Sequence, residues 1–183
     1  MQRPLTQIGS QPHTRKSSLI ACTSQLHELD IAVTDPIDIS TSSSPWAAYE
    51  SELHFYDSIS RSSFHIVWNE DGEITAALAL QILHAMAKSK PIVLVKKPIF
   101  HPEVDAFTRE VIVAHIKDMT IANLPKLEAA ELNFILKNLS QQDYSLSAHE
   151  LTLISSRVKA SFRRLLEQAK SELGAPHLEY ATK

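Results

Sequence analysis

The sequence holds very little cysteine and glycine, and both shortages narrow what the protein can be. Cys22 is the one cysteine among 183 residues, which excludes an internal disulfide and fits a reducing compartment. The three glycines form neither a G-x-G-x-x-G fingerprint nor a P-loop, the two commonest phosphate-binding loops. Motifs that ligate metals, such as H-E-x-x-H and paired cysteines, are missing too, so we expect neither a metal site nor a cofactor.

Long apolar runs and a strong charge of one sign are also missing. No apolar stretch approaches the roughly 20 residues that a membrane span requires, and the N-terminal "MQRPLTQIGSQPH" lacks the apolar run of a signal peptide. The formal net charge is −3, and basic residues gather only around 157–164, so nucleic acid is not an expected partner. We therefore expect a soluble, cytoplasmic protein that binds neither membranes nor nucleic acid.

What the sequence does contain is a regular alternation of short apolar runs with amphipathic segments. Strands are predicted at 4–9, 31–39, 64–68, 91–95 and 120–124. A helix is predicted after each strand, at 18–29, 46–60, 73–89, 104–119 and 126–139. Each connection is long enough for a right-handed crossover. The pattern predicts an α/β domain over residues 1–140: a three-layer sandwich around a five-stranded parallel sheet of order 2-1-3-4-5.

Two of the predicted strands, "FHIVW" and "PIVLV", are apolar on both faces. Parallel strands covered by helices on both sides have this composition. We therefore expect Ile66, Val67, Val93 and Leu94 to lie nearly fully buried in adjacent central strands.

A separate piece follows "SQQDYSLS", where residues 145–174 are predicted to form one long amphipathic helix. Ser147 is expected as its N-cap, with Glu150 completing a capping box. The apolar stripe either packs on the protein's own α/β domain or joins two copies. We expect a homo-oligomer, because the helix offers more apolar length than one small domain must cover.

The candidate chemistry lies in "WNEDGEITAALALQILHAMAKSKPIVLV", residues 68–95. The turn after a parallel strand lies at the carboxyl edge of the sheet, where such folds bind ligands. Asp71 and Glu73 offer carboxylates there, and Gln81 and His84 are spaced to share one face of the next helix. The simpler interpretation is an Asp-Gly turn with Glu73 favouring a helix N-terminus, which needs no ligand. His84 is either a general base or a hydrogen-bonded structural residue.

The order of these segments resembles the nucleoside 2-deoxyribosyltransferase-like family, which has a flavodoxin-like fold. The resemblance covers roughly residues 4–139 and is carried by "IGSQPHTRKSSLIACTSQLHELDIAVTDP", "FHIVWNEDGEITAALALQILHAMAKSKPIVLV" and "TIANLPKLEAAELNFIL". It implies that the protein binds a nucleoside or nucleotide, transfers or hydrolyses an N-glycosidic bond, and assembles as an oligomer. It also implies a substrate-binding set made of Gly9, His13, Asn69, Asp71 and His84.

The chain departs from the family at the position that carries the chemistry, as a divergent member would. The resemblance puts Gln81 where the family has a nucleophilic Glu, and Ala77–Leu78 where it has a small polar pair. A carboxylate can attack the anomeric carbon and stabilise an oxocarbenium-like transition state, whereas a neutral amide does both poorly. Two hypotheses follow: an enzyme whose carboxylate comes from Asp71 or Glu73, or an inactive relative with a structural or oligomeric role.

Overall fold

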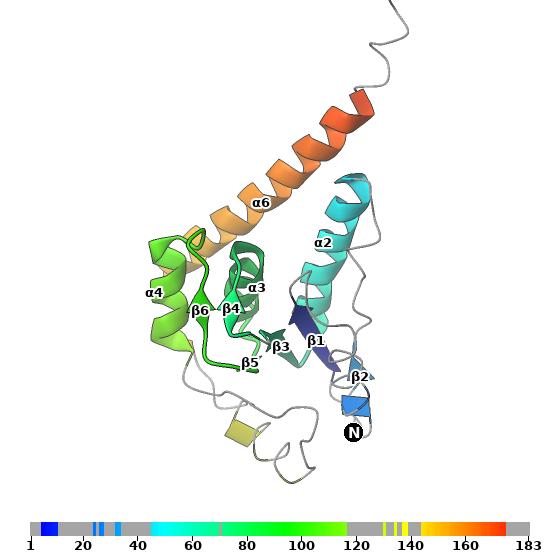
Figure 1. Cartoon of the computed structure of the whole chain (residues 1–183). Helices are drawn as coiled ribbons and strands as arrows, with labels where there is room; N and C mark the ends of the chain where they lie inside the picture. The colour runs from blue at the N-terminus through cyan, green and yellow to red at the C-terminus, as the bar shows by residue number, and fades with distance from the viewer. Residues whose placement is uncertain are drawn as a thin grey trace, which may run out of the picture.

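The computed structural model describes residues 5–10, 24, 26–27, 32–33, 45–69, 71–116, 130, 134, 137–138 and 144–174. Within these residues the protein is an α/β structure with four helices and short parallel strands in two small sheets (Figure 1). The strands are β1 (Leu5–Ser10), β2 (Ala32–Val33), β3 (Phe64–Trp68), β4 (Glu73–Ile74), β5 (Ile92–Leu94) and β6 (Ile99–Phe100). The helices are α2 (Pro45–Arg61), α3 (Ala76–Ala87), α4 (Ala106–His115) and α6 (Ala148–Gly174).

The main sheet has four parallel strands in the order β2-β1-β3-β5. β2 is the neighbour of β1 on one side, and β3 is its neighbour on the other side. The order of the strands therefore changes direction at β1. Among the described residues no fifth strand joins this sheet, so the five-stranded sheet is not seen. The strand expected at 120–124 lies outside the described residues.

The predicted burial of the two apolar runs and their pairing as neighbours are confirmed, but only β3 is a central strand, because β5 is the last strand of the described main sheet. Ile66, Val67, Val93 and Leu94 have exposed fractions of 1%, 0%, 1% and 2%, and β3 and β5 pair in parallel, with Ile66 opposite Val93. Val67 and Leu94 belong to the core that α3 covers. Because side chains alternate along a strand, Ile66 and Val93 face the opposite side of the sheet. Both faces of the sheet are therefore buried at these strands.

A second, two-stranded parallel sheet was not expected from the sequence. Glu73 pairs with Ile99, and Ile74 pairs with Phe100. The two short strands β4 and β6 follow β3 and β5 in the chain. The prediction that residues 73–89 are helical is wrong at its start. The Thr75 side chain accepts a hydrogen bond from the backbone N–H of Leu78 at 3.3 Å and so caps α3, which begins at Ala76.

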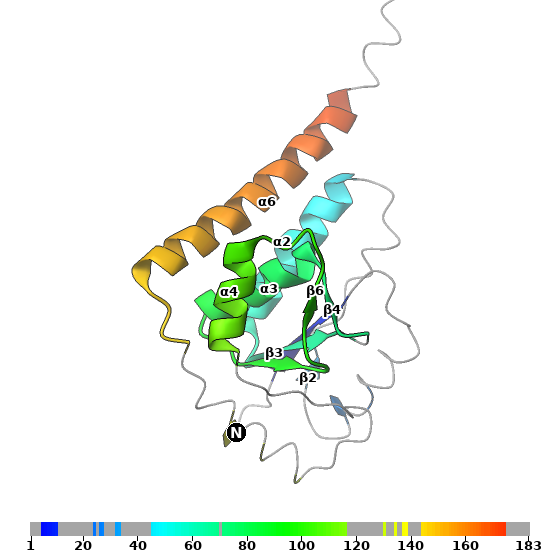
Figure 2. The same ribbon diagram turned by 60° about the vertical axis from the view of Figure 1, so that its left-hand side comes forward.

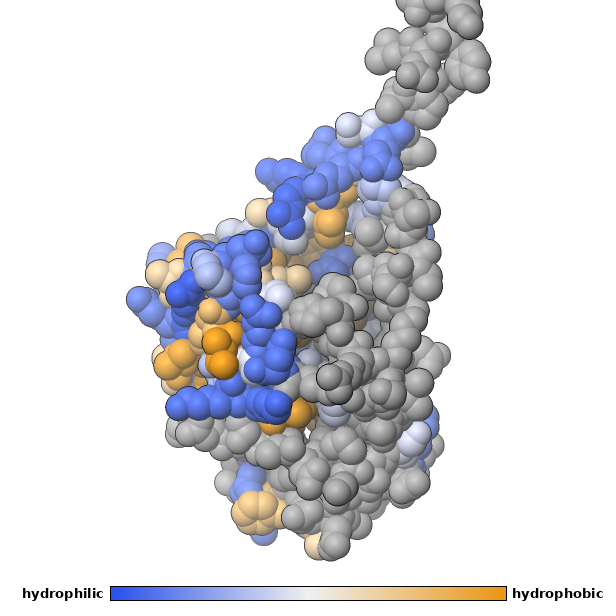
Figure 3. Space-filling model, in the orientation of Figure 1, coloured by the Kyte–Doolittle hydropathy of each residue, from blue (hydrophilic) through white to orange (hydrophobic). Residues whose placement is uncertain are grey.

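The long helix α6 crosses over α2 and α3 (Figures 1 and 2). Much of its apolar stripe is covered by the protein's own domain, since Ile154 and Ala169 are each 1% exposed and the Phe162 ring meets Tyr56 edge-on at 5.0 Å. Leu151, near the start of the helix, is 40% exposed. Figure 3 shows mainly hydrophilic residues along the exposed side of this helix. Of the two interpretations of the stripe, packing within the chain is the one observed, and the homo-oligomer stays a prediction.

The start of α6 confirms the predicted capping box. The Ser147 hydroxyl accepts a hydrogen bond from the Glu150 N–H at 3.2 Å, and the Glu150 carboxylate accepts from the Ser147 N–H at 2.7 Å. The two hydrogen bonds from Ser147 hold the pKa of Glu150 below its usual value. None of the described helices combines the length and the apolarity needed to cross a membrane.

Candidate functional site

Gly9 and Gln81 are brought into direct contact at the carboxyl end of the main sheet. Gly9 is the next-to-last residue of β1 and pairs with Val67 of β3. A Cβ atom at Gly9 would lie 2.6 Å from Oε1 of Gln81 and 3.0 Å from the His65 ring. Real Cβ atoms essentially never approach a neighbour to within 3.0 Å. Glycine is thus the residue that lets the Gln81 amide lie against β1.

The amide oxygen of Gln81 is buried without a hydrogen bond. The side chain is 6% exposed, and Oε1 has no hydrogen-bond partner in the part of the chain that the structure describes. Buried polar atoms in native proteins are nearly always hydrogen-bonded, so each exception calls for an explanation. Gln81 is such an exception at the edge where α/β sheets bind ligands.

Trp68, the last residue of β3, is a second exception at the same end of the sheet. Its indole is 3% exposed, and Nε1 has no acceptor among the described residues. Trp68 pairs with Ser10, one position beyond the Gly9–Val67 pair, so its side chain lies on the face of the sheet opposite to Gln81. An unmatched acceptor and an unmatched donor therefore flank the carboxyl ends of β1 and β3.

The acidic turn is satisfied locally. The Asp71 carboxylate is exposed and accepts a hydrogen bond from the backbone N–H of Glu73 at 3.0 Å. Gly72 has a φ of +89°, a backbone conformation that favours glycine. These are the features of an Asp-Gly turn. The Asp71 carboxylate therefore has a structural role that requires no ligand, and Glu73 contributes its backbone N–H to the same turn.

Asn69 also serves the backbone. It is fully buried, its Nδ2 donates to the carbonyl oxygens of Lys96 at 2.8 Å and Gly72 at 3.3 Å, and its Oδ1 accepts from the Lys96 N–H at 2.9 Å. The side chain thus ties the loop after β3 to the loop after β5.

His84 lies against a different element from Gln81. Its Nε2 is 3.1 Å from the Ser60 hydroxyl, and its ring meets Tyr56 of α2 edge-on at 4.7 Å. Burial, with a smaller effect from Lys88, lowers the pKa of His84 below its ordinary value, so the imidazole is neutral near pH 7. The structure describes a hydrogen-bonded histidine between α2 and α3. His13, the remaining predicted ligand, lies outside the described residues.

A groove of about 320 Å³ lies elsewhere, between α3, α4 and α6, and was not predicted. Arg157 of α6 donates to the Asp105 carboxylate at 3.0 Å and lies over the Phe107 ring at 4.3 Å. Asp105 also caps α4 by accepting from the N–H and the hydroxyl of Thr108. Burial raises the pKa of Asp105, but the hydrogen bonds from Arg157 and Thr108 outweigh this effect and lower the pKa to about 2.

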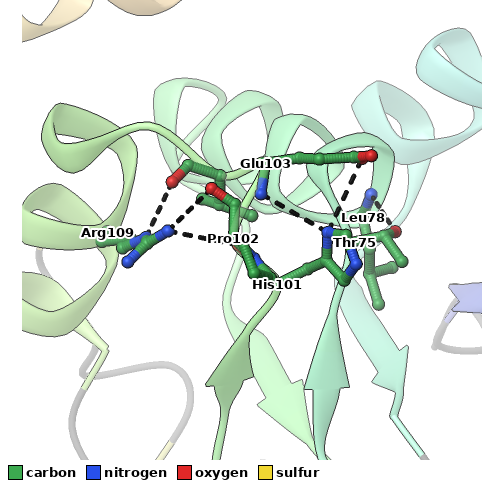
Figure 4. A network of polar contacts seen from close by, with 7 residues as sticks. Thr75, Leu78, His101, Pro102, Glu103 and Arg109 are labelled. Carbon is green, nitrogen blue, oxygen red and sulfur yellow. Dashed lines mark hydrogen bonds and ion pairs between the residues drawn. The ribbon is translucent and has the colours of Figure 1, made fainter.

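The rim of this groove is held by hydrogen bonds within the protein. Arg109 donates to the carbonyl oxygens of Val104 at 2.7 Å, Pro102 at 3.0 Å and His101 at 3.3 Å (Figure 4). Nδ1 of His101 is 3.4 Å from the Glu103 N–H and 3.7 Å from the Glu103 carboxylate. These contacts fix the turn before α4, and their polar groups are matched without a ligand.

The described residues contain no cluster of three or more His, Cys, Asp or Glu side chains that could hold a metal ion. No known protein family, curated protein or solved structure matches this chain.

Proposed function

We propose that the protein binds a nucleoside or nucleotide at the carboxyl edge of its main sheet, between β1 and β3. The observation that carries this proposal is the Gly9–Gln81 contact, which leaves a buried amide oxygen without a hydrogen bond. In the strand order β2-β1-β3-β5 the chain changes direction between β1 and β3. Open α/β sheets bind their ligands in the crevice at such a switch point.

The fold that supports this site is a flavodoxin-like three-layer sandwich. In this proposal residues 120–124 add a fifth strand beside β5 and complete the order 2-1-3-4-5. The first four positions of that order agree with the observed sequence of neighbours, β2-β1-β3-β5. Together with the segments quoted above, this agreement supports the resemblance to the nucleoside 2-deoxyribosyltransferase-like family.

The proposed activity is binding with little or no sugar transfer. A retaining transfer needs a carboxylate close to the anomeric carbon, and the side chain next to Gly9 is the neutral amide of Gln81. If the protein turns over a nucleoside, the carboxylate comes from Asp71 or Glu73, which follow β3 at the same edge. Turnover would then be transfer or hydrolysis of the N-glycosidic bond.

The alternative is an inactive relative with a structural role in a homo-oligomer. One observation favours a surface for assembly: Trp46 and Leu53 of α2, which lie two helical turns apart, are 41% and 42% exposed. Light scattering at micromolar concentration tests this alternative. A mass of one chain excludes it.

A ligand screen tests the main proposal. Nucleosides and nucleotides are compared for the rise in melting temperature that they cause, and each hit is then tested for release of its base by chromatography. We expect several to stabilise the protein, because a ligand that binds the folded state alone raises its stability by mass action. Gln81→Leu should abolish this effect, whereas Gln168→Leu, on the exposed side of α6, should not. A screen without a single hit would reject the proposal.

A further inference from the structure

The groove between α3, α4 and α6 combines an apolar lining with a small size. Small or apolar side chains from all sides line it: Ala76, Ala79 and Leu80 of α3, Val104 before α4, and Ala160 of α6. Its volume of about 320 Å³ lies at the lower end of the roughly 300–1,000 Å³ of small-molecule sites. The lining therefore favours a ligand with a short apolar body.

One face of α6 brings three hydrogen-bonding side chains to this groove. Arg157, Ser161 and Arg164 follow one another at spacings of four and three residues, and all three line the groove. Arg157 donates from Nη2 to the Asp105 carboxylate at 3.0 Å and has further donors to offer. Within the part of the chain that the structure describes, the side chains of Ser161 and Arg164 make no hydrogen bond or ion pair. The polar side of the groove thus offers donors.

The two carboxylates beside the groove are each directed to a group of the protein. Asp105 accepts from Arg157, whose guanidinium also lies over the Phe107 ring at 4.3 Å. The Glu103 carboxylate is 71% exposed and lies 3.7 Å from Nδ1 of His101 (Figure 4). The charge that is left for a ligand is the guanidinium of Arg164. A guanidinium presents its donors in a planar fork that matches the two oxygens of a carboxylate.

We infer that this groove binds a small aliphatic carboxylate. Its chain lies along Ala79, Leu80 and Val104, and its carboxylate accepts hydrogen bonds from Arg164 and Ser161. This inference does not depend on nucleoside binding, because the residues that line the groove include neither Gly9 nor Gln81. The Arg157–Asp105 pair, which joins α6 to the start of α4, then also fixes one wall of the site.

Both parts of the ligand are needed for binding. Each methylene group that leaves water strengthens binding by up to roughly fourfold, so acetate, which has no chain, should bind far more weakly than octanoate. Hydrogen bonds to a charged group are worth roughly 10-fold or more in affinity. Octanol, which has the chain without the charge, should therefore also bind more weakly.

The test is isothermal titration calorimetry of the full chain with octanoate, below the concentration at which it forms micelles. Acetate, octanol and octylammonium are titrated in parallel, and octanoate should bind at least about 10-fold more tightly than each of them. Arg164→Gln should weaken octanoate binding about 10-fold. The matched control Arg163→Gln removes the same charge from the neighbouring exposed position, which does not line the groove, and should leave binding unchanged.

A second variant tests the location. Ala160→Leu adds a larger side chain at an exposed position of α6 that lines the groove, and leucine is a good helix former. It should abolish octanoate binding while the circular dichroism spectrum stays that of the wild type. Unchanged binding in this variant would place octanoate elsewhere and overturn the inference.

The remaining outcomes also decide the question. If octanoate does not bind, or binds no more tightly than octanol, the groove is not a carboxylate site. Tighter binding of octylammonium would show that Glu103 and Asp105 determine the charge preference, which is the opposite of the inference. Equal losses in Arg164→Gln and Arg163→Gln would indicate attraction to the basic side of α6 in general. A nucleoside screen without a hit would reject the proposed function and leave this inference standing.

Discussion

The acidic turn after β3 and the Gly9–Gln81 contact lie at the same edge of the sheet but treat their polar groups in opposite ways. In the turn, Asp71 and Asn69 hydrogen-bond the neighbouring backbone. At the contact, the amide oxygen of Gln81 is buried without a partner among the described residues. The hydrogen bonds of Asn69 and Asp71 thus explain these chemically richer side chains without a ligand. The buried amide oxygen of Gln81, which contacts Gly9, has no such structural explanation.

The largest effect is expected at Asn69, which joins the two loops. Asn69→Ala removes three hydrogen bonds to Gly72 and Lys96 and leaves backbone groups of Lys96 unmatched. The free energy of unfolding should fall by about 2–4 kcal/mol. Urea denaturation followed by tryptophan fluorescence measures it. A loss below about 1 kcal/mol would show that the loops after β3 and β5 do not depend on this side chain.

A somewhat smaller loss is expected where β1 approaches α3. Gly9→Ala places a Cβ atom 2.6 Å from Oε1 of Gln81 and 3.0 Å from the His65 ring, so these side chains must shift. The expected cost is about 1–3 kcal/mol. In a double-mutant cycle, Gln81→Ala should recover part of it, because the obstructing oxygen is removed. Strictly additive effects would contradict the contact.

Removing the unmatched acceptor should stabilise the protein. Gln81→Met keeps the length of the side chain and eliminates the amide, so we expect a gain of about 1 kcal/mol in the free energy of unfolding. Gln168→Met, on the exposed side of α6, should change stability by less than about 0.5 kcal/mol. If Gln81→Met instead destabilises the protein by about 1 kcal/mol, the amide has a structural role. The contrast with the acidic turn would then disappear.

The smallest effect is expected at the exposed carboxylate of the turn. Asp71→Ala loses one hydrogen bond to the Glu73 N–H, which is worth about 0.5 kcal/mol at a solvated site. Stabilisation by any nucleoside should be unchanged in this variant, because the carboxylate serves the turn. If Asp71→Ala abolishes ligand stabilisation while its melting temperature stays near that of the wild type, the acidic turn is part of the binding site.

Much of the fold could be predicted because its signals are local. Two-sided apolar runs predicted the burial of Ile66 and Val93, and Ser147 with Glu150 predicted the start of α6, since caps depend on residues three positions apart. The β4–β6 sheet escaped prediction because each strand has two residues, too few for a periodic pattern. Its formation depends on pairing between segments that are distant in sequence.

The candidate site was predictable in its location and less so in its details. Gly9 ends the strand predicted at 4–9, and Gln81 lies on the helix predicted after the strand at 64–68, so both were expected near the carboxyl edge of one sheet. The shared helical spacing of Gln81 and His84 did not show that His84 contacts α2, because the packing of α2 decides which part of the surface each side chain meets. The Arg157–Asp105 pair had no sequence signal, because its partners are 52 positions apart.

The packing of α6 on α2 and α3 has a consequence for folding during synthesis. This helix is the last described element to leave the ribosome, yet it covers Tyr56 of α2 and contributes Ile154 to the common core. Translation proceeds at about 5–20 residues per second, so the faces of α2 and α3 that α6 covers stay exposed to solvent or to chaperones for several seconds. A nascent chain interrupted before α6 therefore presents an apolar surface, and we expect it to aggregate or to be degraded.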